Sequence, residues 1–247
     1  MSRAAEPGAV HVWSIPLWHP AHLRVGAGRW LDAAERSRAA RCSSGPARRE
    51  FVRTRGAVRT VLAAYTGLPS GGLEFGLGEH GKPRLVGVSS PVRFNVAHSG
   101  GLALLAVAWG REVGVDVEAL RRDLPAARLA ARFYPPTEQA AVCEAGLSDE
   151  ERLRRYVRLW TRKEAYVKAF GGRLVQGASV PVGPLGRAVG LPVSGALGLC
   201  SISDLPFRDG WLASVAMTGD ARYSLSLRSW PQDLSALKGE NRVPAVL

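Results

Sequence analysis

The sequence contains few cysteines and no long hydrophobic run, and each shortage excludes a class of protein. The three cysteines, Cys42, Cys143 and Cys200, are far apart and odd in number, so they predict neither a disulfide framework nor a cysteine-rich metal site. No apolar run approaches the roughly 20 residues that cross a bilayer, and residues 1–8 lack a signal-peptide pattern. We therefore expect a protein of the reducing cytoplasm without a membrane partner.

Several familiar catalytic motifs are missing, and lysine is scarce. The sequence has no GxxxxGK[ST] loop, no GxSxG elbow and no HExxH helix, which argues against P-loop, serine-hydrolase and zinc-protease chemistry. The net charge of +12 predicts an anionic partner: a nucleic acid, a phosphorylated small molecule or an acidic protein. Four of the 33 basic residues are lysines, and Lys82, Lys163 and Lys168 lie in the segments described next. A lysine ammonium suits a phosphate as a compact point charge.

A helical pattern begins near Asp149 and includes residues 160–168, Trp-Thr-Arg-Lys-Glu-Ala-Tyr-Val-Lys. Apolar residues recur on one face at helical spacing: Leu153, Val157, Trp160 and Val167. Arginines occupy the other side, where we expect water: Arg154, Arg155, Arg158 and Arg162. Glu164 falls on the apolar face, with Lys163 beside it. A core-facing carboxylate is costly unless it is paired or binds a metal, which favours a chemical role over a simple Glu164–Lys168 helix pair.

The clearest β pattern covers residues 92–118, which we expect to form an antiparallel meander of three strands. In its last strand Asp116 and Glu118 are two residues apart, so both carboxylates project from one face. Two such acids repel each other unless a cation lies between them, although acids on a wet strand face are common. If the helix packs on this strand, Glu164 joins them, and three carboxylates suit magnesium.

The order of elements predicts an α+β fold made of two similar halves. Helices precede antiparallel strands twice, so we expect two α/antiparallel-β halves that pack as an intramolecular pseudo-dimer. We place the first half at residues 1–111, the second half with the metal site at 112–230, and a loosely held tail at 231–247.

A row of arginines follows the helix predicted at residues 47–65. Arg48, Arg55 and Arg59 are spaced 7 and 4 apart and therefore share one side. The row is either a solvated face or a cradle for an anion.

Two segments together resemble a known family. Gly-Val-Asp-Val-Glu at residues 114–118, followed about 40 residues later by residues 160–168, is similar to the paired signature of the phosphopantetheinyl transferases. The chain length points to the surfactin-synthetase-activating (Sfp-like) class. The resemblance covers roughly residues 48–175 and includes Gly-Lys-Pro at residues 81–83, residues 94–99 and residues 133–138.

The resemblance implies an activity and a set of site residues. The chain would transfer the phosphopantetheine arm of coenzyme A to a serine of a carrier protein, releasing adenosine 3',5'-bisphosphate. Asp116, Glu118 and Glu164 would hold magnesium, or alternatively manganese, on the pyrophosphate. Lys168 would act in catalysis, with either Glu138 or Glu164 as the base. The remaining contacts to coenzyme A would come from basic and polar side chains: Arg48, Arg55, Lys82, His98, Ser99, Lys163 and again Lys168.

The partners implied by the resemblance are coenzyme A and acidic acyl or peptidyl carrier domains, as used in polyketide or nonribosomal peptide synthesis. A chain of charge +12 would steer such carriers electrostatically, with residues 119–137 as the docking surface. We expect a monomer, because the pseudo-dimer supplies both halves of the site. The rivals are a basic nucleic-acid-binding protein, which lacks a recognition motif here, and a catalytically inactive paralogue that binds coenzyme A.

One position departs from the family pattern. Arg173 stands where members usually have a second glycine after the central helix. If that position requires a positive φ, an arginine would be strained there.

Overall fold

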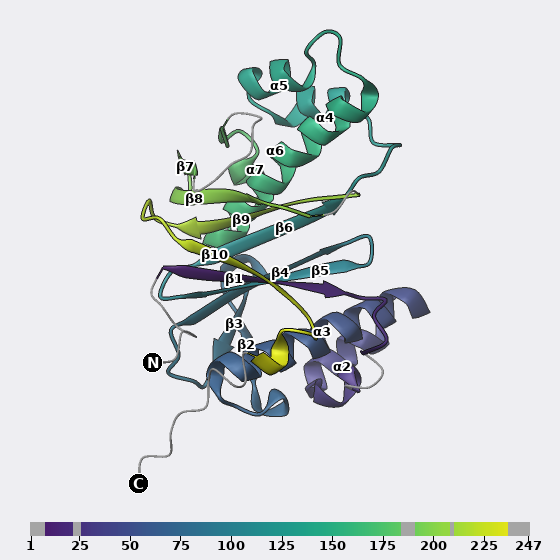
Figure 1. Ribbon diagram of the computed structural model, residues 1–247, viewed down its shortest axis with the longest axis vertical. Helices are drawn as coiled ribbons and strands as arrows, with labels where there is room; N and C mark the ends of the chain where they lie inside the picture. The colour runs from purple at the N-terminus through teal and green to yellow at the C-terminus, as the bar shows by residue number, and fades with distance from the viewer. Residues whose placement is uncertain (1–7, 22–25, 184–190, 208–209, 237–247) are drawn as a thin grey trace.

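The computed structural model describes residues 8–21, 26–183, 191–207 and 210–236. Two four-stranded sheets occupy the middle of the molecule, and helices cover the outer side of each (Figure 1). The predicted α+β fold is therefore confirmed. No helix in the described ranges has the length and apolar character that a bilayer crossing requires.

The first half is built around α3, which lies across the sheet β10-β1-β5-β4 (Figure 1). A separate two-stranded sheet, β2-β3, flanks it. The elements of this half are β1 (Ala9–Pro16), η1 (Ala27–Trp30), α2 (Ala33–Ala40), α3 (Gly45–Thr66), η2 (Ser70–Gly72), β2 (Glu74–Leu77), η3 (Glu79–Gly81), β3 (Pro83–Val86), β4 (Val92–Ser99) and β5 (Leu102–Trp109).

The second half is built around α6, which packs on the sheet β6-β9-β8-β7. Its elements, with the last strand of the chain, are β6 (Val113–Ala119), α4 (Ala126–Phe133), α5 (Pro136–Val142), α6 (Asp149–Phe170), α7 (Leu174–Gly177), β7 (Leu191–Gly195), β8 (Gly198–Leu205), β9 (Trp211–Thr218) and β10 (Ser224–Ser229).

Three apolar clusters hold these layers together. The first lies between α3 and its sheet and includes Trp13, Leu62 and Leu105. The second lies between α6 and its sheet, and the third joins the two sheets through residues such as Val12 and Val115. Because each strand shows alternate side chains to opposite faces, a sheet that is covered on both faces needs apolar residues at nearly every position. The fully buried β5 meets this requirement.

The connections differ from the sequence-based expectation at two points. The meander ends after β5, because β6 leaves that sheet and pairs with β9 instead. The last strand, β10, was expected in the second half but pairs in parallel with β1 of the first half. The first half is therefore completed by a strand from the other end of the chain, whereas the second sheet uses only strands of the second half. Residues 237–247 of the predicted tail lie outside the described residues.

The central helix α6 begins and ends where the sequence predicts. The Ser148 hydroxyl accepts a hydrogen bond from the Glu151 amide in a capping box, and three acids in the first turn complement the helix dipole. Gly171 ends the helix in the left-handed conformation, with φ 65°. The expectation that Arg162 meets water is wrong, since it is fully buried and forms two 2.8 Å hydrogen bonds with Asp204.

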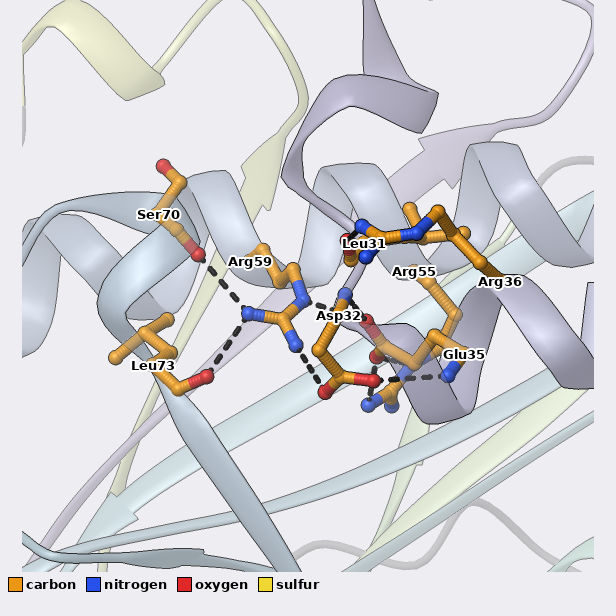
Figure 2. Close-up of polar contacts among 8 residues, drawn as sticks. All are labelled: Leu31, Asp32, Glu35, Arg36, Arg55, Arg59, Ser70 and Leu73. Carbon is orange, nitrogen blue, oxygen red and sulfur yellow. Dashed lines mark hydrogen bonds and ion pairs between the residues drawn. The ribbon is translucent and has the colours of Figure 1, made fainter.

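The arginine row on α3 is not wholly exposed to solvent, and Arg59 binds groups of the protein itself. Figure 2 shows that Arg59 pairs with Asp32 and Glu35 and donates to the backbone oxygens of Ser70 and Leu73. Arg59 is fully buried, so its charge is compensated inside the protein. It ties α2 and the loop after α3 to the helix itself.

Candidate active site

The helix α6 lies against β6 and brings the two signature segments together. Asp116 on β6 is 3% exposed, and its Oδ1 lies 2.6 Å from the Lys168 Nζ on α6. The same Nζ lies 3.7 Å from the Glu164 Oε2, one helical turn earlier. Lys168 thus lies between the strand acid and the helix acid.

Glu118, the second strand acid, is bound from the first half. The Ser99 hydroxyl at the end of β4 donates a 2.9 Å hydrogen bond to Glu118 Oε2. The same hydroxyl accepts a 3.1 Å bond from the amide of Ala119. Residues of both halves therefore meet at the end of β6 where the acids lie.

Burial dominates the electrostatics of Asp116. The pKa of the Asp116 carboxyl is raised to about 7: burial raises it most, Lys168 opposes this effect, and the neighbouring Glu118 and Glu164 carboxylates add to it. Burial would lower the pKa of Lys168, but Asp116 and Glu164 outweigh that effect, so the pKa of Lys168 is raised. The lysine ammonium therefore stays charged among the acids.

Gly114 permits the close approach of the strand to the helix. A Cβ at residue 114 would lie 2.1 Å from the Ala165 backbone oxygen and 2.3 Å from the Ala169 backbone nitrogen. Both atoms belong to the backbone of α6 and cannot rotate away. A glycine is thus required two residues before Asp116 for the strand and the helix to touch.

The chemistry of the three acids suits a divalent cation, but the structure does not group them as a set of metal ligands. In the described part of the chain, no three His, Cys, Asp or Glu side chains are grouped as metal ligands. The Asp116 Oδ2 is nevertheless buried and has no hydrogen-bond partner there. A buried carboxylate oxygen without a partner is costly. Three carboxylates without His or Cys suit a hard cation such as magnesium.

A pocket of about 400 Å³ opens at some distance along β6, beside Lys82, Glu112 and Ala169. None of the three acids lines it. Asp116 instead lies in a buried position beside Lys168.

The predicted coenzyme A contacts of the first half occupy different surroundings. Arg48 is exposed in the first turn of α3. His98 is exposed, with Nδ1 3.4 Å from the Glu50 carboxylate. Arg55 pairs with Glu35, and its guanidinium lies 4.6 Å from the centre of the Phe75 ring. Arg48 and His98 therefore present their side chains to solvent, whereas Arg55 is held inside an ion pair.

Lys82 was predicted to grip a phosphate, but the structure gives its ammonium three protein acceptors. Its Nζ lies 2.6 Å from Glu112 Oε2, 3.1 Å from the Val113 backbone oxygen and 2.8 Å from the Ala169 backbone oxygen. An ammonium has three donors. All three are used, so we remove Lys82 from the predicted phosphate contacts.

Lys163 and Glu138 were predicted as a coenzyme A contact and a candidate base, but the structure pairs them in the core. The Lys163 Nζ is fully buried, 2.7 Å from Glu138 Oε2 and 2.5 Å from the Val180 backbone oxygen. The Glu138 Oε1 accepts a 2.7 Å bond from the Val182 amide. Burial lowers the pKa of Lys163, and Glu138 opposes this effect. Both side chains are buried, and their ion pair connects α5 to α6.

Comparisons with known proteins agree with the paired signature. Residues 112–183 match the model of the 4'-phosphopantetheinyl transferase superfamily. The chain is 38% identical to the 4'-phosphopantetheinyl transferase HetI of Nostoc sp. over 164 residues, which cover 66% of this chain and 68% of the relative. It is 30% identical to the putative 4'-phosphopantetheinyl transferase slr0495 of Synechocystis sp., over 92% of this chain and 97% of the relative. The chain belongs to the 4'-phosphopantetheinyl transferase superfamily.

A third relative within the superfamily is the 4'-phosphopantetheinyl transferase of Bacillus subtilis, 30% identical over 51% of both chains. The family predicted from residues 114–118 and 160–168 is therefore confirmed. The assignment to the surfactin-synthetase-activating class stays a prediction.

Arg173 does not strain the backbone of this phosphopantetheinyl transferase in the turn after α6. Its φ is −103° and its ψ 146°, an extended conformation open to any residue. In the turn that directly follows α6, the left-handed conformation is taken by Gly171. The expectation of strain at residue 173 is therefore wrong, because the turn is completed before that residue.

Asn95, which the sequence analysis did not single out, binds the strand that carries Asp116. It is 5% exposed on β4, and its Oδ1 accepts a 3.0 Å bond from the Val115 amide, next to Asp116. A signal was present, since Asn95 is a polar residue inside the apolar strand at residues 94–97. A buried amide side chain must find hydrogen-bond partners, but the sequence alone does not show where they are.

Proposed function

We propose that the cluster around Asp116 is the place where this 4'-phosphopantetheinyl transferase moves the phosphopantetheine arm of coenzyme A onto a carrier-protein serine. The observation that carries the proposal is the buried carboxylate itself. One of its oxygens binds Lys168, while the other has no hydrogen-bond partner among the described residues. Such a group is suited to bind a cation together with a charged substrate.

The reaction breaks the phosphoanhydride bond of coenzyme A and forms a phosphodiester bond to the carrier serine. The serine hydroxyl attacks the β-phosphorus of coenzyme A, the pyrophosphate bond breaks, and adenosine 3',5'-bisphosphate leaves. Asp116, Glu118 and Glu164 would hold magnesium, which supplies charge neutralisation on the pyrophosphate when it is bound. Lys168 places a permanent positive charge beside them, where negative charge on the phosphates requires compensation.

Glu164 is the better candidate for the base that receives the serine proton. Its side chain is 18% exposed at the cluster, whereas Glu138 is 5% exposed and paired with Lys163. A base must come within hydrogen-bond reach of the proton that it accepts. Glu138 could do so only if the core around α5 opened.

The exposed arginines that follow β6 would form the surface that binds the carrier protein. Four exposed arginines lie in the linker and α4: Arg121, Arg122, Arg128 and Arg132. Opposite charge steers a partner toward its site and raises the association rate. An acidic carrier domain is therefore the partner that this surface favours.

A loading assay tests the proposed activity. We expect the purified protein with magnesium, coenzyme A and an apo carrier to add one phosphopantetheine to the carrier, as measured by intact-protein mass spectrometry. Carriers from fatty-acid, polyketide and nonribosomal peptide systems should be compared side by side. Binding of coenzyme A without a mass gain on any carrier would instead identify an inactive paralogue.

Replacing Lys168 with alanine should weaken coenzyme A binding. A charge-assisted hydrogen bond contributes about 1.5–3 kcal/mol, so we expect KM for coenzyme A to rise by about tenfold or more. Arg154→Ala removes the same unit charge from an exposed ion pair of α6 and serves as the control. An unchanged KM in the Lys168 variant would return Lys168 to the role of a partner for Asp116 alone.

A further inference from the structure

The strand that carries Asp116 and Glu118 has one free edge. In its sheet β6 pairs only with β9, so its opposite edge has no strand partner there. Unpaired backbone groups inside a protein are costly and must be satisfied by other means. Three of the groups on this edge are the backbone oxygen of Val113 and the amides of Val115 and Ala119, and side chains of the first half bind these three.

The three side chains are Lys82, Asn95 and Ser99. Lys82 donates to the Val113 oxygen at 3.1 Å, Asn95 accepts from the Val115 amide at 3.0 Å, and Ser99 accepts from the Ala119 amide at 3.1 Å. They replace the missing strand with hydrogen bonds at both ends and in the middle of β6.

Lys82 also binds the end of α6. Its Nζ donates 2.8 Å to the Ala169 oxygen, which lies in the last turn of the helix, where carbonyl groups lack an intrahelical partner. Ala169 follows Lys168 directly in the chain, and Val113 lies three residues before Asp116. The Lys82 ammonium thus connects the strand to the helix near the 2.6 Å Asp116–Lys168 contact.

We infer that Lys82 and Asn95 are positioning residues that fix β6 against α6, and so set where Asp116 lies relative to Glu164 and Lys168. The inference rests on the proposed function for its consequence in catalysis. It gives the side chains of Lys82 and Asn95 one shared role, which is to hold the strand in place. A displacement of about 1 Å in a reacting group can cost about a hundredfold in rate.

The test separates positioning from phosphate binding. We expect Lys82→Met and Asn95→Leu each to lower kcat by about tenfold or more, while the Kd values for coenzyme A and for adenosine 3',5'-bisphosphate, measured by calorimetry, stay within about twofold. Lys82→Arg keeps donors at this position and should recover most of the lost rate. Arg84→Met is the matched control, since Arg84 is an exposed cation on the adjacent β3 and should leave kcat unchanged.

Hydrogen exchange supplies a readout that does not depend on turnover. In Asn95→Leu the amide of Val115 should exchange faster than in the wild type, because its acceptor is lost. Should Lys82→Met fail to fold, Lys82→Arg and Asn95→Leu decide the question by the same kcat and Kd values.

Two results would overturn the inference. A Kd for adenosine 3',5'-bisphosphate that rises about tenfold at constant kcat would make Lys82 a phosphate ligand. Unchanged kcat in both variants would show that the strand needs neither side chain. A wild-type protein that binds the nucleotide but loads no carrier would instead refute the proposed function, and the Val115 exchange rate would still test the role of Asn95.

Discussion

Replacing Asp116 with alanine should reduce phosphopantetheine transfer by roughly a thousandfold while the protein stays folded. Loss of one preorganised charged group at a reacting centre typically costs 10²–10³ in kcat, and the proposed site would also lose a metal ligand. Asp116 has the most buried carboxylate of the three acids and the direct bond to Lys168. Transfer should be followed by intact-protein mass spectrometry of the carrier.

The fold should survive because the Asp116 carboxylate contributes little net stability. Its burial is costly, as the raised pKa shows. Without Asp116, the Lys168 ammonium still has the Glu164 carboxylate nearby and is 31% exposed to water, so its charge remains compensated. We expect the free energy of unfolding to change by less than about 2 kcal/mol. Urea denaturation measures this quantity.

Two further variants sharpen the test of Asp116. Asp116→Asn keeps the shape and removes the charge, so it should be as inactive as the alanine variant. Glu150→Ala removes an exposed acid at the other end of α6 and should retain full activity. Wild-type turnover in either Asp116 variant would refute the metal assignment and move the reactive centre away from β6.

Local periodicity predicted the elements of this site well. The two-residue spacing of Asp116 and Glu118 fixes which face of a strand they share, and the helical spacing turns Glu164 inward. Both inferences need only the geometry of one element. The structure agrees, since Lys168 contacts Asp116 and Glu164 together.

The roles of the lysine and arginine side chains could not be predicted from local spacing. Lys82, Lys163 and Arg59 look alike in a sequence, yet each is satisfied by acceptors distant in the chain. Several of those acceptors are backbone oxygens, which every residue possesses. A sequence pattern therefore shows that a charge is present but cannot distinguish a ligand contact from an internal tether.

Strand pairing escaped prediction for a related reason. The turn at residues 110–111 is compatible with a hairpin, yet β6 pairs with β9 about 100 residues later. Likewise β10 returns to β1 across most of the chain. Such pairings depend on which apolar faces meet in the layer between the sheets, and local sequence carries little information about that choice.

Gly114→Ala should strongly destabilise the protein and also abolish transfer. The added Cβ would lie 2.1 Å from the Ala165 oxygen, 2.3 Å from the Ala169 nitrogen and 2.9 Å from the Lys168 carbonyl carbon, all of them backbone atoms of α6. Overpacking commonly costs about 1–3 kcal/mol and occasionally more. We expect a loss at or above the upper end of that range, because a whole helix must move rather than a side chain.

The same movement would separate Asp116 from Lys168, so activity should fall further than stability alone explains. Urea denaturation and the loading assay, run below the unfolding transition, measure the two effects separately. Gly71→Ala is the matched control: its Cβ would meet only Trp30, at 3.8 Å, so stability should change by less than about 0.5 kcal/mol. A Gly114→Ala protein with wild-type stability and turnover would show that β6 and α6 need not touch, and that the contact between Asp116 and Lys168 does not depend on this glycine.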